Sequence, residues 1–566
     1  MNMNTMNRNR LVATFLERRG YTKHALTELN DGVHANLLDI HSLACELKTI
    51  HDEQKLLVIL PDFDMDGISA GTEGFAGFTE LGFRVALFRP DPADGYGFTP
   101  ETICRLKDEF PDVHAILTCD TGITCYAGVA AAQAMGIRVF VTDHHVQQDA
   151  RLCADVIVNP NRLDETYENK GICGAHVLWQ VLQYYANTFG TRFEQSQIRR
   201  LCVFAGIGTI SDSMPLVMEN RQLVRDACGI CRLLVEPFFV DNMVGTKAYL
   251  RAFRGLHVVL SLFEEMGKIS GPDDIDEEFF GYYLAPMFNA AKRMNGDMNV
   301  VFGVFFGNTP DEDARTLYEL NERRKATVDR YFRKLSEDDQ PYAPYVFISE
   351  APSGILGLLA TRVMMNTGDP AFVLAKDGDK YHGSGRTPDW YPAITNLSPE
   401  GFYIAGHEHA FGIGVTDARE LKSLAVFLDK SVDEARASVT VDENAFAPDI
   451  LISTYDTNAD SGIDIPLFAE YIREIRDYAP FGPGFEKPRI AFTFHPSDGE
   501  WTTMGSVKQH LKISLPYGFE VLCWNQAGRI GELQHAESVV VWGSLGISEF
   551  RGRRTVNFVG DAEVMA

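Results

Sequence analysis

Five short apolar runs separated by helix-like segments constrain the fold of this chain more than any other feature. The runs lie at residues 55–61, 84–90, 114–120, 138–143 and 154–160. Continuously apolar strands that alternate with helices are typical of a parallel sheet covered on both faces. We therefore predict an α/β fold built on a doubly wound parallel sheet.

Acidic side chains and imidazoles gather where three of these runs end. A doubly wound sheet brings the carboxyl ends of its strands to one edge, and ligands bind beyond that edge. We therefore expect these side chains to meet in space. They are Asp62, Asp64 and Asp66 after the first run, Asp120 after the third, and Asp143, His144 and His145 after the fourth. A mostly helical segment further along carries one more carboxylate in a Gly/Ser setting, Asp212.

This set of ligands favours a hard divalent cation. Carboxylates with neutral imidazole and no cysteine suit Mn²⁺ or Mg²⁺ better than a structural zinc. Four to six ligands can hold two ions, the arrangement that clamps both oxygens of an in-line phosphoryl displacement. We expect Asp120 to contact both ions and to set their spacing. The DxDxDG stretch alone also resembles a calcium loop, but it follows a strand and lacks the downstream Glu.

The length of 566 residues is too great for one hydrophobic core, so several domains are expected. Changes in pattern and a Pro/Tyr-containing break at 338–345 indicate the boundaries. The predicted segments are an N-terminal helical cap (1–50), the parallel-sheet domain (51–234), a helical connector (235–337), a second, smaller α/β domain (338–440) and a C-terminal β-barrel (441–566).

Composition limits the partners and the compartment. No apolar stretch is long enough to span a bilayer, and the ten scattered cysteines fit a reducing environment, so we predict a cytoplasmic protein with no membrane partner. A net charge of −26 argues by itself against a polyanionic partner. Bound cations and local basic patches can reverse that sign at a site, so the charge alone does not decide.

Several motifs, taken in order, resemble the RecJ branch of the DHH phosphoesterase superfamily. They are DFDMDG (62–67), CDTG (119–122), DHH (143–145), NPN (159–161), GTISDSMPLVMENR (208–221), LAPMFNAAKRM (284–294), GSGRT (383–387), AGHEHAFGIG (405–414) and GSVKQHLKI (505–513). The resemblance runs from about residue 50 to the C-terminus. It implies a DHH domain at 51–234, a DHH-associated domain at 338–440 and an OB-fold at 441–566.

The resemblance also implies roles for residues. The cluster of Asp62, Asp64 and Asp66, together with Asp120, His144 and Asp212, would hold two metals, although which two of the first three ligate stays open. Asp143 would orient its neighbouring imidazole, and His145 would face the scissile phosphate. Arg293 would contact phosphate. The residues expected to bind substrate are Arg386, Ser384 and His407 in the associated domain, and Lys508, Lys512 and Trp524 in the OB-fold.

The function implied is a 5′→3′ exonuclease that hydrolyses single-stranded DNA by metal-activated water, acting in DNA repair or recombination with replication or repair proteins as possible partners. Two alternatives stay open at this point: a phosphodiesterase for short oligonucleotides or cyclic dinucleotides, and a non-catalytic replication or repair scaffold. The segment EAPSGILG (350–357) lacks a His that is usual in the family, and Ala405 and Phe411 replace a usual Gly and Ala. These departures leave substrate length, polarity and DNA-versus-RNA preference open.

Overall fold

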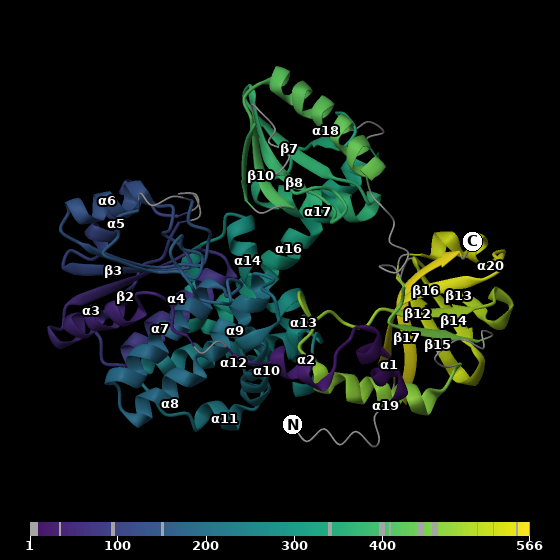
Figure 1. The fold of residues 1–566 in the computed structure, drawn as a ribbon, viewed down its shortest axis with the longest axis horizontal. Coiled ribbons are helices and arrows are strands. Elements are labelled where there is room, and N and C mark those ends of the chain that lie inside the picture. The colour runs from purple at the N-terminus through teal and green to yellow at the C-terminus, as the bar shows by residue number, and fades with distance from the viewer. Residues whose placement is uncertain are drawn as a thin grey trace. The chain divides into compact units, whose positions relative to one another are not determined.

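A computed structural model describes most of the chain (Figure 1). The residues it describes are 9–32, 35–91, 97–148, 152–337, 342–394, 402–406, 409–438, 447–454, 462–505, 508–524, 526–550 and 553–564. They group into two compact units. One unit contains the described residues of 33–214 and 223–440, and the other those of 1–32, 215–222 and 441–566.

The first sheet lies in the larger unit and is wholly parallel, with strand order β2-β1-β3-β4-β5. Its central strands are buried on both faces, which explains their continuously apolar sequences. The predicted doubly wound parallel sheet is therefore confirmed. The strands are β1 (Leu56–Pro61), β2 (Val85–Leu87), β3 (Val113–Cys119), β4 (Arg138–Thr142) and β5 (Val156–Val158).

Helix α4 (Met65–Glu80) follows β1 directly and begins inside the acidic motif. Its small residues allow close helix packing, because a Cβ at Gly74 or Gly77 would lie 2.9 Å from a leucine side chain of α7. The other helices of this region are α3 (Ile40–Asp52), α5 (Pro100–Glu109), α6 (Tyr126–Ala134), α7 (Gly174–Phe189), α8 (Arg192–Arg200) and α9 (Cys202–Ser211).

A helical segment links the first sheet to the second. Its helices include α10 (Met218–Leu234), α11 (Pro237–Asp241), α12 (Lys247–Glu265), α13 (Glu277–Phe279), α14 (Ala285–Arg293), α15 (Met298–Phe306) and α16 (Pro310–Glu337). The last of these is a 28-residue helix that packs against both α14 and α15.

The second sheet has the order β6-β7-β8-β10-β9 and is mixed, with only the β6–β7 pair parallel. Alternate residues of β7 face opposite sides: Phe372 and Leu374 pack with α18, and Val373 packs with α17. The elements are β6 (Val346–Ile348), α17 (Leu356–Thr367), β7 (Ala371–Asp377), β8 (Lys380–Arg386), β9 (Tyr403–Gly406), β10 (Ala410–Val415) and α18 (Ala418–Ser438).

The smaller unit contains a seven-stranded sheet with the order β11-β12-β16-β17-β15-β14-β13. One apolar core joins this sheet to helix α19 (Ile465–Ile475) and to two N-terminal helices, α1 (Arg10–Arg18) and α2 (Lys23–Glu28). The strands are β11 (Ile450–Ser453), β12 (Ile490–Phe494), β13 (Glu500–Met504), β14 (His510–Leu515), β15 (Phe519–Cys523), β16 (Val539–Phe550) and β17 (Arg553–Val564), with the short α20 (Ile530–Gln534).

The predicted N-terminal cap is divided in the structure. Leu11, Phe15 and Leu26 are buried in the core of the C-terminal sheet, so the first two helices complete that domain. Helix α3 instead packs against α7 and β5 of the parallel-sheet region. The helical pattern of 1–50 was recognisable, but the pattern carries no information about which core its apolar face covers.

The segment 215–222 also belongs to the smaller unit. Arg221 is almost fully buried there, and its guanidinium donates to the backbone oxygens of Pro480 (2.6 Å) and Tyr478 and lies over the ring of Phe485. The Leu216 amide donates to the Pro483 oxygen at 2.7 Å. The segment is therefore an integral part of the C-terminal domain.

No helix among the described residues is long and apolar enough to cross a membrane.

Candidate metal centre

The acidic motif after β1 forms the entry to α4. Asp64 is the N-cap, and its Oδ1 accepts from the amides of Asp66 (3.1 Å) and Gly67 (3.3 Å). Asp66 is fully buried, and its two oxygens accept from the amides of Gly174 (2.6 Å) and Ala175 (3.1 Å) at the start of α7. The motif therefore fixes all three carboxylates, including buried Asp62, at the carboxyl edge of the sheet.

Asp120 stands directly after β3 in the left-handed backbone region, with φ of 62°. Its amide donates to the Thr142 oxygen at 3.0 Å, which ties this turn to the end of β4. A Cβ at Gly174 would lie 2.4 Å from the Asp120 Cβ, so the first residue of α7 must be glycine for the carboxylate to fit.

The three residues after β4 share one hydrogen-bond network. Asp143 is fully buried, and its Oδ1 accepts from the amides of His144 (2.7 Å) and His145 (3.1 Å) and from the His145 Nδ1 (2.8 Å). Asn159 and Asn161 hold the same turn from β5, because their side-chain amides donate to the backbone oxygens of His145 and His144. The NPN motif therefore acts by fixing the backbone of the DHH turn.

The structure brings all eight predicted metal and catalytic residues to one place. The His144 Nε2 lies 3.2 Å from an Asp120 oxygen, 3.3 Å from an Asp212 oxygen and 3.9 Å from an Asp66 oxygen. Three overlapping groups have ligand atoms within 4.8 Å of one another, so the side chains of each group could bind one ion. The groups are Asp120–His144–His145, Asp66–His144–Asp212 and Asp62–Asp64–Asp120.

Several carboxylates lie close together in this buried site, and this raises the pKa values of some of them. Burial, followed by the charge of Asp64, raises the pKa of Asp62 to about 7. Burial and neighbouring carboxylates also raise the pKa values of Asp120 and Asp212 well above their usual range. Burial lowers the pKa of His144 and keeps the imidazole neutral, which is the form that binds a metal.

Asp143 and His145 show the opposite balance. Burial alone would raise the pKa of Asp143, but its hydrogen bond with His145 and other contacts lower it. Burial would lower the pKa of His145, yet the Asp143 hydrogen bond and nearby carboxylates raise it to about 9. Asp143 is therefore an ionised anchor that orients the His145 ring and stabilises its protonated form.

Three buried atoms at the centre make no hydrogen bond with any described residue: Asp62 Oδ2, Asp120 Oδ1 and His144 Nε2. Leaving buried polar atoms unpaired is costly, and so is crowding carboxylates in a buried site. A divalent cation would satisfy the free lone pairs and offset the negative charge. The donor atoms present therefore fit the Mn²⁺ or Mg²⁺ that the sequence predicts.

The predicted substrate-binding residues fall into two places. Arg293, at the end of α14, and Ser384 and Arg386, on β8, lie in the larger unit with the metal centre. His407 lies outside the described residues. In the smaller unit Lys508 is exposed and Trp524 is 49% exposed. Lys512 is paired with Glu520 on the neighbouring strand, so its charge is already offset, which the sequence pattern did not indicate.

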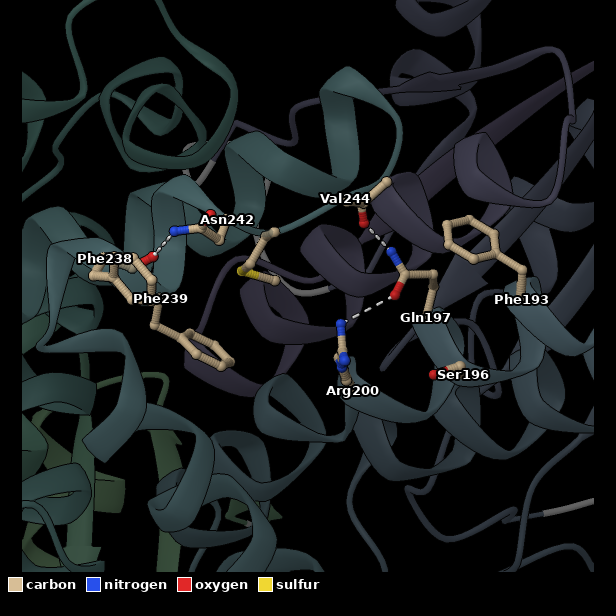
Figure 2. A pocket seen from close by; sticks show the side chains of 9 residues that line it. Phe193, Ser196, Gln197, Arg200, Phe238, Phe239, Asn242 and Val244 are labelled. Carbon is tan, nitrogen blue, oxygen red and sulfur yellow. Dashed lines mark hydrogen bonds between the residues drawn. The ribbon is translucent and has the colours of Figure 1, made fainter.

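An apolar pocket of about 450 Å³ lies between α8 and the α11 region and contains none of the acidic ligands (Figure 2). Phe193 and Phe238 line it and are 53% and 79% exposed. Two of its polar side chains are hydrogen-bonded: Arg200 donates to Gln197 at 3.2 Å, and Gln197 donates to the Val244 oxygen. The pocket has no ligand set for a metal and is separate from the chemistry described above.

Glu73 was not predicted from the sequence; it is fully buried in α4, seven residues after Asp66. Neither of its carboxylate oxygens makes a hydrogen bond of ordinary geometry with a described residue, and the Ala205 backbone only partly offsets the cost of burial. Burial, followed by the charge of Asp66, raises the pKa of Glu73 well above its usual range. The surrounding sequence of small and apolar residues was the available signal that this side chain would lack a partner.

We expect Glu73→Leu to stabilise the protein by about 1–3 kcal/mol at pH 8, because it removes a buried polar group without a partner. The folded-state pKa is raised, so the folded protein binds the proton more tightly, and wild-type stability falls as pH rises from about 4.5 towards that pKa. The stabilisation by Glu73→Leu should therefore shrink as pH is lowered to 5. Denaturant unfolding at both pH values measures it.

The matched control is Glu319→Leu on the exposed face of α16, for which we expect a change within about 0.5 kcal/mol at either pH. A Glu73→Leu variant that is less stable than the wild type at pH 8 would contradict the interpretation of Glu73 as an unpaired acid.

Comparison with known proteins agrees with this architecture. The model of the DHH family N-terminal domain matches residues 56–207, and the model of the RecJ OB domain matches residues 466–561. The single-stranded-DNA-specific exonuclease RecJ of Salmonella typhimurium is 25% identical, with 89% of this chain and 86% of the relative aligned. The RecJ of Thermus thermophilus is also 25% identical, over 91% of this chain and 69% of the relative.

Solved structures share the fold. The crystal structure of Thermus thermophilus RecJ in complex with Mn²⁺ matches with a TM-score of 0.71 and 22% identity, covering 98% of this chain and 76% of that one. The parallel sheet with acidic strand ends and the family-model match define a protein of the DHH superfamily. Within it the chain is a RecJ-like member, since a RecJ OB domain follows and the curated relatives align along most of its length.

Proposed function

We propose that this protein is a metal-dependent exonuclease that hydrolyses the phosphodiester bonds of single-stranded DNA from the 5′ end. The observation that carries the proposal is the convergence of Asp62, Asp64, Asp66, Asp120, His144 and Asp212 on one buried site in a chain that also has a RecJ OB domain. The curated relatives are single-stranded-DNA-specific exonucleases, which supports the same substrate here.

The proposed metal ligands are those six residues, with two divalent cations, Mn²⁺ or Mg²⁺. When bound, the cations supply Lewis acidity, which lowers the pKa of water and offsets charge on the phosphate. Asp143 holds the His145 Nδ1–H, so that Nε2 can keep a proton and donate it to a phosphate oxygen. Arg293, Arg386 and Ser384 would bind neighbouring phosphates.

The OB domain would hold the strand outside the active site. Trp524 exposes about half of its surface and meets the His510 ring edge-on, with centroids 4.8 Å apart. Such an aromatic platform stacks bases without sequence preference. The exposed Lys508 is the better candidate for a phosphate contact, because Lys512 already pairs with Glu520. We further propose a cytoplasmic role in DNA repair or recombination, a location that the ten scattered cysteines fit.

The direct test of this function is a gel of product lengths from 5′- and 3′-labelled DNA and RNA strands with Mn²⁺. We expect the 5′ label to appear at once as a mononucleotide, while the 3′-labelled DNA strand shortens progressively. Hydrolysis of dinucleotides without degradation of long strands would favour the oligonucleotide phosphodiesterase. No hydrolysis of any nucleic acid would favour the scaffold.

Trp524→Ala should weaken the binding of single-stranded DNA by roughly 5- to 100-fold, because one stacked base contributes about 1–3 kcal/mol. Fluorescence anisotropy with a labelled oligonucleotide measures the change. Tyr517→Ala is the control, since Tyr517 is 84% exposed in the same domain and is not assigned to the strand path. Equal affinities for the two variants would remove Trp524 from the proposed path.

A further inference from the structure

The connector helix α16 carries two adjacent arginines, Arg323 and Arg324, that differ in their burial. Arg324 is only partly exposed, whereas the adjacent Arg323 is exposed. The Arg324 Nε donates to the Oδ1 of Asn321 at 3.0 Å, and Asn321 itself is 2% exposed. This side chain therefore lies on the packed face of the helix and is held there by a buried amide.

The neighbours of Arg324 on the same face show where that face is packed. Residues four apart on a helix share a face, so Leu320 and Val328 flank Arg324. Leu320 lies against the turn after α14, because a Cβ at Gly296 would be 2.9 Å from its Cδ2. Val328 packs in one apolar cluster with Leu356 at the start of α17. Arg324 is thus between the end of α14 and the start of α17.

The two predicted phosphate-binding arginines lie at these same two places. Arg293 ends α14, and a Cβ at Gly354 would lie 2.4 Å from its backbone oxygen. A Cβ at Gly357, in the first turn of α17, would lie 3.0 Å from the Arg386 Nη2 and 3.3 Å from the Ser384 Oγ. Two glycines therefore allow the backbone before and within α17 to approach both arginines.

Arg293, Arg324 and Arg386 place three positive charges in one partly buried region, so a bound anion would offset their mutual repulsion. None of them forms an ion pair with a described carboxylate, and the nearby Glu322 is paired with Lys325 at 2.7 Å. Burial lowers the pKa values of Arg324 and Arg386, and in both the charge of Arg293 lowers them further. Burial also lowers the pKa of Arg293, which the charge of Asp64 in the metal centre opposes.

We propose that Arg324 binds a substrate phosphate together with Arg293 and Arg386, so that α16 contributes directly to substrate recognition. This inference rests on the proposed function, because it assigns the anion as a phosphate of the nucleic-acid strand next to the one at the metal centre. The guanidinium fork suits a phosphate because it donates two parallel hydrogen bonds, and Nε is already held by Asn321.

The test compares Arg324→Gln and Arg324→Lys with Arg323→Gln as the matched control on the same helix. All are made in full-length protein that also carries Asp120→Asn, so that binding is measured without hydrolysis. Anisotropy with labelled single-stranded DNA across a salt series gives the affinity and its salt dependence. We expect Arg324→Gln to weaken binding by about 10- to 100-fold and to reduce the slope of log affinity against log salt by about 0.7.

Arg324→Lys should retain the salt slope and recover only part of the affinity, because it keeps the charge without the fork. Arg323→Gln should change affinity by less than about twofold. The proposal is overturned if Arg324→Gln behaves like Arg323→Gln, or if it loses affinity with no change in slope, as a purely structural role would predict. If Arg324→Gln does not fold, Arg324→Lys decides the question. Weakened binding with an unchanged slope of log affinity against log salt would support the proposal. A reduced slope would overturn it.

If the proposed function itself is wrong, a different result is expected: protein without the Asp120→Asn substitution would leave single-stranded DNA intact in Mn²⁺. In the active protein, Arg324→Gln should raise KM more than it lowers kcat, because the phosphate contact is made before the chemical step.

Discussion

Asp120→Asn should abolish hydrolysis, with a loss of about 10³-fold or more in kcat. Asp120 belongs to two of the three ligand groups at the centre, and its Oδ1 lies 3.2 Å from the His144 Nε2. The positive φ of Asp120 and the close approach of Gly174 fix its carboxylate in place, so a neighbouring side chain cannot replace it. Mononucleotide release in Mn²⁺ measures the loss.

The same substitution should have the opposite effect on stability when no metal is added. Burial and four neighbouring aspartates make the Asp120 carboxylate costly, so we expect metal-free Asp120→Asn to melt at a higher temperature than the wild type. Added Mn²⁺ should stabilise the wild type more than the variant, because a ligand that binds only the folded state stabilises it by mass action.

Asp108→Asn is the control for Asp120→Asn, since Asp108 is an exposed carboxylate on α5. It should leave activity, the metal-free melting temperature and the Mn²⁺ shift unchanged. Full activity of Asp120→Asn in Mn²⁺, or an Mn²⁺ shift equal to that of the wild type, would remove Asp120 from the metal centre.

His145→Ala should lower kcat by about 10²- to 10⁴-fold while changing the affinity for Mn²⁺ much less. The His145 Nδ1 is engaged by Asp143 at 2.8 Å, and the ring is partly exposed, as a group that meets substrate requires. His144 is nearly fully buried, and its Nε2 lies within 4 Å of three carboxylates. The two adjacent imidazoles therefore have different surroundings.

Titration of Mn²⁺ by calorimetry, together with kcat at saturating metal, separates the two roles. We expect His144→Ala to lose metal affinity and His145→Ala to retain it. His145→Gln tests the proton, since it keeps a polar side chain but cannot hold a positive charge. If His145→Ala loses Mn²⁺ affinity as His144→Ala does, then His145 is a ligand and its assignment to the phosphate is wrong.

The metal centre was predictable because it depends on one topological rule. Continuous apolar runs identify parallel strands, and parallel strands deliver whatever follows them to one edge. Asp62, Asp120 and His144 therefore meet although they are far apart in the sequence. The predicted strands at 55–61 and 138–143 agree with β1 and β4 to within about one residue at either end.

Other features depend on contacts that no local pattern records. The helical periodicity of residues 10–18 predicts an apolar face, but not that Leu11 and Phe15 would cover a sheet more than 400 residues later. Arg323 and Arg324 are adjacent residues of the same type, so the sequence pattern does not distinguish them. They differ only in burial, which the packing of α16 determines. The pairing of Lys512 with Glu520 likewise depends on the register of β14 and β15.

The smaller unit is built from three separate stretches of the chain, which limits how the protein can be divided into fragments or recombined. A fragment starting at residue 441 would lack α1, whose leucines and phenylalanine close the core, and would lack Arg221, which holds the backbone at 478–480. The C-terminal domain is therefore not a cassette that can be excised, expressed or exchanged by a single cut. Recombination that preserves it must carry three separated stretches of the gene together.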